Sequence, residues 1–271
     1  MCEFCTRHGE GKKWYENMEN YSKEVFSRVN SKDNLKKYLR GFRKRLSFLP
    51  YTAYRVKKLF PGLYDSLVYP RVTSHLKKTH FGQVVPLEDA FNIVERVHSI
   101  VRLPCVCRKV TRGKEYRYCL GVGMDLREYV QDVPDFQNFD LISREKAKKL
   151  LNYLEGEGMV HSIWTFGTPF IGAICNCDRD CMAYNVQVKF DIAKAMWKGE
   201  YVAQIDPFLC NGCRQCMKQC IFQAVEYDMR EEKCRVNIQK CYGCGICRKE
   251  CKKEALNLQD RYQVMGSQAV W

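Results

Sequence analysis

Two stretches of the chain repeat one cysteine spacing, CNGCRQCMKQC at Cys210–Cys220 and CYGCGICRKEC at Cys241–Cys251. When the two copies are aligned over eighteen residues, seven positions match, and all four cysteines are among them. Each copy follows a short run of strand-forming residues, YVAQI at 201–205 and CRVNI at 234–238. Each copy also runs into a short helical stretch and then VEYDM or LNLQD. The sequence therefore predicts a unit of strand, cysteine loop, short helix and strand that occurs twice.

The cysteine spacing in each copy is typical of an iron–sulfur site. Three thiolates separated by two residues each can surround one face of a [4Fe–4S] cluster, and Gly212, Gly243 and Gly245 allow the backbone to approach it. The fourth cysteine lies further along the chain and reaches the other cluster. Structural zinc is the alternative, because CxxC pairs also suit a tetrahedral site. The predicted ligands are Cys210, Cys213, Cys216 and Cys251 for one cluster, and Cys241, Cys244, Cys247 and Cys220 for the other.

Residues 201–262 resemble a bacterial-type two-cluster ferredoxin through these two cysteine stretches. The resemblance implies a ferredoxin-like domain that binds two [4Fe–4S] clusters and passes single electrons. One difference from the family pattern is plain. The family usually has Pro after the fourth cysteine, whereas Ile221 follows Cys220 and Lys252 follows Cys251 in this chain.

Nine of the seventeen cysteines lie outside the two repeats. Most of them are grouped, in LPCVCRK, YRYCLG and AICNCDRDC, and such dense thiols indicate metal binding because unligated thiols in loops are prone to oxidation. Cys234 has no partner at ligand spacing, and we interpret it as a packed thiol.

The middle of the chain resembles the domain that precedes the ferredoxin module in a group of multidomain archaeal and bacterial iron–sulfur proteins. The matching pieces are LPCVCR at 103–108, CLGVG at 119–123, EGEGMVHS at 155–162 and ICNCDRDC at 174–181. The resemblance implies an additional metal site. Relatives often have further cysteines after the ICNC stretch, where this chain has aspartates, so the resemblance does not give a ligand count.

Two further metal sites are predicted. The first is a third [4Fe–4S] cluster, with structural zinc as the alternative. The second would use the CxxCxxH pattern at the N-terminus, which needs a fourth ligand; the alternative is a chain end that binds no metal. The candidate ligands are Cys105, Cys107 and Cys119 with one or more of Cys175, Cys177 and Cys181 for the third cluster, and Cys2, Cys5 and His8 for the N-terminal site.

The positive charge of the chain is concentrated near its start. Residues 1–80 contain eighteen Lys or Arg and seven Asp or Glu, which accounts for +11 of the formal charge of +14. The segment SKDNLKKYLRGFRKRLSFL, residues 31–49, predicts a basic amphipathic helix. This helix would bind an anionic membrane surface or an acidic protein. In the alternative interpretation, its apolar face packs on its own domain and its charges are solvated. Nucleic acid is not an expected partner. Residues 48–70, with their prolines and aromatic residues, predict a wrapped extension.

The middle region contains recognisable secondary structure. Helices are predicted at Pro86–Val101 and Ser143–Leu154, followed by a hairpin around Gly167–Pro169. The expected fold is α+β. It consists of a helical basic N-terminal arm, a mixed α/β and winged-helix-like domain containing cysteines, a ferredoxin-like domain and a tail. These parts cover residues 1–83, 84–200, 201–262 and 263–271.

These features predict an electron-transfer subunit that links a redox partner to a catalytic oxidoreductase subunit. No segment has the apolar character of a signal peptide or a transmembrane helix, so we expect a cytoplasmic protein, with peripheral membrane attachment as an option. Two alternatives stay open. One is a redox-sensing regulator that binds nucleic acid, and the other is an iron–sulfur enzyme with an open cluster site in the middle domain.

Overall fold

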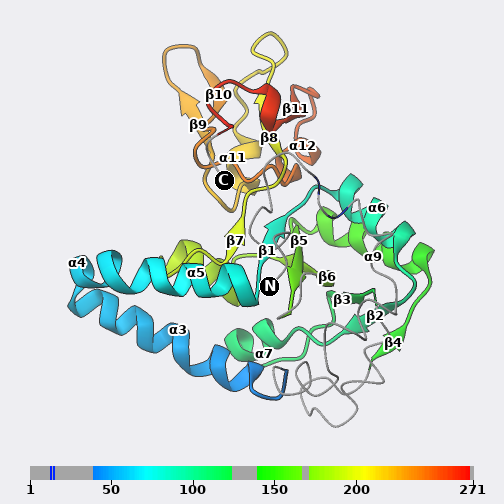
Figure 1. Ribbon diagram of the computed structural model, residues 1–271. Coiled ribbons are helices and arrows are strands. Elements are labelled where there is room, and N and C mark those ends of the chain that lie inside the picture. The colour runs from blue at the N-terminus through cyan, green and yellow to red at the C-terminus, as the bar shows by residue number, and fades with distance from the viewer. Residues whose placement is uncertain (1–12, 14, 16–38, 124–138, 167–170, 269–271) are drawn as a thin grey trace.

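The computed structural model describes residues 13, 15, 39–123, 139–166 and 171–268. Within them the fold is mixed α/β, built on a mostly antiparallel sheet of seven strands in the order β4-β2-β3-β6-β5-β1-β7 (Figure 1). The pair β1–β7 is parallel. The strands are β1 Gly82–Val84, β2 Ile100–Leu103, β3 Cys119–Val122, β4 Asp140–Leu141, β5 Val160–Thr165, β6 Ile171–Cys177 and β7 Met196–Trp197.

Two helices, α6 (Leu87–Arg96) and α9 (Arg144–Gly156), cover one face of this sheet. They pack against each other, and their apolar side chains join Ile163 and Ile174 of the central strands in one buried core. Ser143 caps α9 as predicted, since its hydroxyl accepts a hydrogen bond from the Lys146 amide at 3.3 Å.

The first helix is shorter than the sequence predicts. We expected it to reach Val101, and this was wrong, because α6 ends at Arg96 and the backbone of Val97 is already extended. Residues Ile100–Leu103 instead form β2, which pairs with β3 on one side and β4 on the other. The spacing of apolar residues up to Val101 favours a helix, but strand pairing with β3 and β4 determines the structure of residues 100–103.

The predicted hairpin after α9 is present as the antiparallel pair β5–β6. In β6, Cys175 and Cys177 are two residues apart and so lie on the same face of the strand, opposite to the face covered by α6 and α9. That second face carries α7 (Val106–Arg112), α10 (Met182–Tyr184) and the π-helical segment η5 (Asn185–Lys189).

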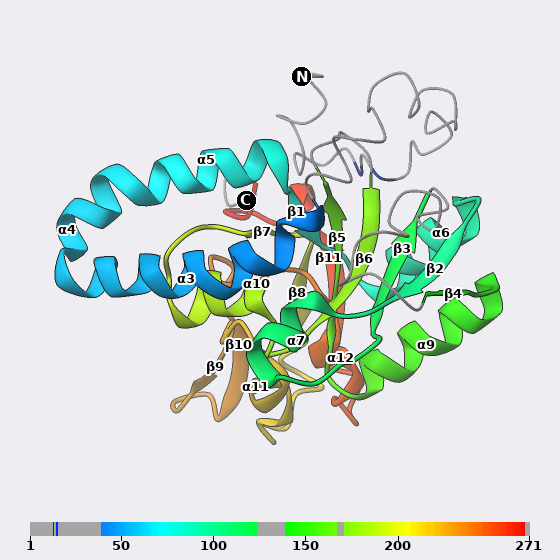
Figure 2. The ribbon, with the colours of Figure 1, turned by 90° about the horizontal axis from the view of Figure 1, so that it is seen from below.

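A long helical hairpin extends away from the sheet (Figure 2). It consists of α3 (Phe42–Leu59), α4 (Pro61–Leu63), the π-helical segment η3 (Tyr64–Val68) and α5 (Tyr69–Thr79). The wrapped extension that we predicted for residues 48–70 was therefore wrong. Two of the prolines are tolerated because Pro61 and Pro70 stand in the first turn of their helices, where no intrahelical N–H donor is needed.

The C-terminal region contains two small antiparallel sheets, β8–β11 and β9–β10, each with two strands. The strands β8 and β11 coincide with the predicted YVAQI and LNLQD segments, so that the first and last strands of the repeat pair with each other. The elements are β8 Tyr201–Ile205, α11 Gln215–Gln219, β9 Val225–Asp228, β10 Lys233–Val236, α12 Ile246–Lys249, β11 Leu256–Asp260 and the 3₁₀ turn η6 Arg261–Gln263.

A continuous apolar core joins the C-terminal region to the second face of the large sheet. Tyr184 of α10 meets Ile221 and Phe222 there, and the ring of Phe222 stacks on that of Tyr242 at 3.9 Å between centroids. The two regions are therefore packed on each other as parts of one folded unit. None of the helices in the described segments is long and apolar enough to cross a bilayer.

Candidate metal centres

The first predicted ligand set surrounds a single cavity in the C-terminal region. Cys210, Cys213, Cys216 and Cys251, here called the first group, all line this cavity. The first three come from the loop before α11 and from α11 itself, whereas Cys251 follows α12. The pairing of β8 with β11 closes the repeat and brings these distant positions together.

The loop of the first group needs glycine at one point. Gly212 has a φ of +69°, and a Cβ there would lie 2.2 Å from the carbonyl oxygen of Glu232. No side chain fits so close to a backbone oxygen, so the sequence CNGC allows a path that an L-residue would block. The next residues continue the turn, since Arg214 also has a left-handed φ of +64° and starts α11.

A fifth cysteine lines the same cavity. Cys234 lies on β10, is 4% exposed and interacts electrostatically with Cys216. The interpretation of Cys234 as an isolated packed thiol was therefore incomplete: it is buried, but beside candidate ligands. Cys234 has no neighbouring cysteine at a spacing typical of metal ligands. Only its position in the strand that leads into the second cysteine loop could have indicated that it lines the first cavity.

The second predicted ligand set also comes together. Cys220, Cys241, Cys244 and Cys247, here called the second group, interact electrostatically with one another. Backbone amides point at two of the sulfurs: Ala224 donates to Cys220 Sγ at 3.2 Å, and Ala203 donates to Cys241 Sγ at 3.4 Å. Thus Cys220, from the first repeat, lies with the loop of the second repeat, as the predicted exchange of the fourth cysteines requires.

The six middle cysteines gather where β2 and β6 end and where β3, α7 and α10 begin. They form the middle group. Cys105 Sγ lies 3.3 Å from Cys119 Sγ. Because Leu120 pairs with Ile174 in the β3–β6 ladder, Cys119 lies next to Cys175, and the two thiols interact electrostatically. The remaining members are Cys107 of α7, Cys177 of β6 and Cys181 before α10, and these three also interact with the group.

Arg108 is a functional candidate that the sequence did not single out. Its side chain is 2% exposed, and its guanidinium forms an ion pair with Asp178 at 2.9 Å. It also donates to the carbonyl oxygen of Asn176 at 3.0 Å and lies 3.8 Å from Cys105 Sγ. A buried cation beside thiols favours their thiolate form and compensates the charge of a metal-thiolate group. The PCVCR motif contained this residue, but spacing alone did not assign it a role.

Three of the candidate ligands have raised thiol pKa values. Burial raises the pKa of Cys107, Cys216 and Cys247 to about 12 in each case. A metal or cluster binds the thiolate, so that loading these groups must release protons and is favoured by higher pH.

Across the described residues, no three His, Cys, Asp or Glu side chains converge closely enough to hold one metal ion. Zinc requires all its sulfur ligands at about 2.3 Å from one point. The four cysteines of the first group line one cavity, and its occupation by an iron–sulfur cluster or by zinc stays a prediction.

The N-terminal candidates Cys2, Cys5 and His8 lie outside the described residues. His161 is buried at 1% exposure, and its ring nitrogen Nδ1 is hydrogen-bonded to Asn176. The chain matches no protein-family model, no curated protein and no solved structure.

Proposed function

We propose that the chain is an iron–sulfur electron-transfer protein whose C-terminal region is a ferredoxin-like domain with two [4Fe–4S] clusters. The observation that carries the proposal is the exchange of the fourth cysteines. Cys251 lines the cavity of the first group, and Cys220 lies with the second group. A pair of independent zinc ribbons does not need this exchange, because each would use the cysteines of its own repeat. Two-cluster ferredoxins use it in the way the structure arranges it here.

The chain supplies the surroundings of both clusters, and the bound clusters supply one-electron transfer. The amides of Ala203 and Ala224 donate to sulfur atoms of the second group, which stabilises thiolates. The two groups differ in access to solvent. Cys213 of the first group is exposed, whereas Cys241, Cys244 and Cys247 are buried. We therefore place the contact with an external redox partner at the first group.

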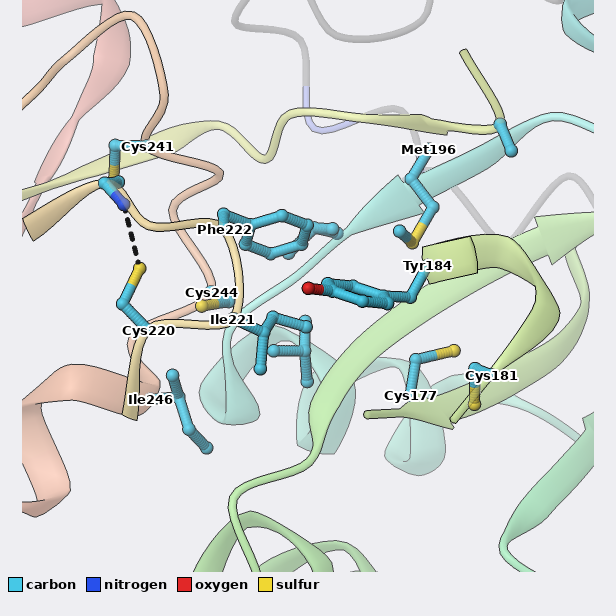
Figure 3. Close-up of a cluster of buried hydrophobic side chains, with 14 of the residues drawn as sticks. Cys177, Cys181, Tyr184, Met196, Cys220, Ile221, Phe222, Cys241, Cys244 and Ile246 are labelled. Carbon is cyan, nitrogen blue, oxygen red and sulfur yellow. Dashed lines mark hydrogen bonds between the residues drawn. The ribbon is translucent and has the colours of Figure 1, made fainter. Parts of the chain in front are cut away.

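The second group faces the interior, toward the middle group. Figure 3 shows Cys220, Cys241 and Cys244 on one side of the aromatic core, and Cys177 and Cys181 on the other side. Tyr184, Ile221 and Phe222, which belong to the same buried apolar cluster, lie between them in this view. A third centre in the middle group, either iron–sulfur or zinc, would extend the series of sites through this core. As an iron–sulfur cluster it would continue the electron path; as zinc it would be a structural clamp.

The partner in this proposal is a catalytic oxidoreductase subunit, to which the cysteine groups with their clusters would pass single electrons. The two alternative functions are a nucleic-acid-binding redox sensor built on a winged-helix-like middle domain and an enzyme with an open cluster. No specific contact among the described residues favours either alternative.

Metal analysis of anaerobically purified protein tests the proposal. We expect about eight iron atoms and a similar amount of acid-labile sulfide from the C-terminal region. About four more iron atoms, or one zinc ion, would come from the middle group. The variant Cys213→Ser should lose or convert one cluster in the low-temperature EPR spectrum of the reduced protein. The surface variant Met265→Ser, at a side chain that is 92% exposed, is the control. Unchanged iron content and unchanged electron transfer in Cys213→Ser would refute the assignment.

A further inference from the structure

The end of the helical hairpin exposes an apolar surface that the electron-transfer proposal does not use. Between Tyr51 and Pro70, Tyr64 is the one buried residue. We call the exposed apolar side chains at this end the hairpin tip. Its members, with the exposed fraction of each residue, are Val56 (42%), Leu59 (72%), Phe60 (59%), Leu63 (60%) and Leu67 (46%).

The hairpin tip follows from how the hairpin is attached. Its inner side is fixed to the segment after η5, where the Tyr64 hydroxyl donates to the Ile192 carbonyl oxygen at 3.0 Å and Tyr54 stacks on Phe190 at 4.7 Å. The Lys194 amide also donates to Thr73 Oγ1 at 3.0 Å. These contacts hold both arms of the hairpin in place and leave the members of the hairpin tip on the outside. Both views show α4 at the end of the hairpin that lies away from the sheet (Figures 1 and 2).

The hairpin that carries this apolar end is strongly basic. Residues 42–79 contain nine Lys or Arg and a single acidic residue, Asp65. Asp65 pairs with Lys57 at 3.0 Å, and Lys57 also pairs with Asp191 of the body at 2.8 Å. Arg55, Lys58 and Arg71 near the tip are exposed. The end of the hairpin therefore combines the exposed apolar side chains of the hairpin tip with exposed basic side chains beside them.

We propose that the hairpin tip inserts into an anionic membrane surface. Apolar side chains on an interfacial helix enter the boundary between headgroups and acyl chains by about 5–10 Å, and basic residues beside them interact with anionic headgroups. A convex end of two helices suits this shallow insertion. The basic charge favours an anionic surface over a zwitterionic one. This inference does not depend on the metal content of the cysteine groups.

Vesicle flotation with the full-length protein tests the inference. The probes are phosphatidylcholine vesicles with about 30% phosphatidylglycerol, and pure phosphatidylcholine vesicles as the neutral comparison. We expect binding to the anionic vesicles that weakens as NaCl rises from about 50 to about 500 mM. The triple variant Leu59→Ser, Phe60→Ser, Leu63→Ser should bind the anionic vesicles at least about tenfold more weakly, because it removes the inserted apolar area. Met229→Ser, at a side chain 77% exposed in the C-terminal region, should bind like the original protein.

A second measurement reports insertion directly. In the variant Leu63→Trp, the added tryptophan should shift its emission to shorter wavelength with anionic vesicles, whereas Met229→Trp should show no added shift. Absence of vesicle binding by the original protein would overturn the inference and point to an acidic protein partner instead. Equal binding by the triple variant, or no emission shift at position 63, would overturn it as well.

Discussion

The thiol of Cys234 interacts electrostatically with the thiol of Cys216 inside the cavity that the first group lines. Cys216 lies on α11 and Cys234 on β10, so that the contact joins the two halves of the repeat. The cavity therefore offers five thiols, one more than a [4Fe–4S] cluster binds.

This contact predicts that Cys234 can replace Cys216 as a ligand. The variant Cys216→Ala should keep most of its iron, with an altered EPR signal, because a second thiol is already next to the vacated position. The double variant Cys216→Ala, Cys234→Ala should lose about four iron atoms per chain. Iron and sulfide analysis distinguishes the two variants. Equal iron loss in both would show that Cys234 does not act as a ligand.

Arg108 offers a prediction about the middle group. Replacing the buried Arg108 by Met removes its hydrogen bond to Asn176 and leaves Asp178 without its ion-pair partner, so the free energy of unfolding should fall by about 2–3 kcal/mol. The matched control is Arg112→Met, which breaks the exposed pair with Asp180 and should leave stability nearly unchanged. Urea unfolding of both variants measures the difference. Similar losses in the two variants would mean that the burial of Arg108 has no energetic consequence.

Gly243 should be the least replaceable glycine of the second loop. Its φ is +70°, and a Cβ would lie 2.1 Å from the Tyr201 carbonyl oxygen. We expect Gly243→Ala to lower the free energy of unfolding by about 3 kcal/mol and to reduce iron retention. Gly113→Ala separates the two causes, because Gly113 has a similar φ of +67° but open space around it. It should cost about 1 kcal/mol, from the backbone conformation alone. A similar loss of unfolding free energy in Gly243→Ala and Gly113→Ala would show that the close approach to the Tyr201 carbonyl oxygen is not the cause.

His161 predicts a loss of stability in mild acid. Burial lowers the pKa of His161 to about 4, while the ordinary value in an unfolded chain is about 6.5. The side-chain amide nitrogen of Asn176 donates to the Tyr118 carbonyl oxygen. Its side-chain oxygen therefore accepts a hydrogen bond from His161 Nδ1 at 2.6 Å. The buried imidazole ring of His161 is neutral in the folded state. Below pH 6.5, His161 is protonated in the unfolded state but stays neutral in the folded state until the pH approaches 4. Stability is thus fully present above pH 6.5 and falls as the pH approaches 4.

The size of this effect is about 3 kcal/mol between pH 7 and pH 4. It is measured as the difference in unfolding free energy between the original protein and His161→Gln, since other groups also titrate in this range. Glutamine can still donate to Asn176 but has no charge to gain, so the variant should show a flatter pH profile. Parallel profiles would exclude His161 as the source of the acid sensitivity.

The sequence alone determined much of the local structure of the C-terminal region. The CxxCxxC spacing, the glycines at positive φ and the strand-forming runs predicted β8, β11 and the order of elements, because these signals act over a few residues. The Ser143 cap was predicted for the same reason. The assignment of clusters to the two cysteine groups stays a prediction.

Tertiary structure alone decided the features that depend on contacts between distant segments. Sheet pairing ended α6 at Arg96 and turned residues 100–103 into a strand, because hydrogen bonds to β3 and β4 outweighed the helical periodicity. The approach of β10 to α11 brought Cys234 into the first cavity. The sequence shows neither contact, because periodicity and spacing describe neighbours along the chain, whereas burial and strand pairing are properties of the assembled fold.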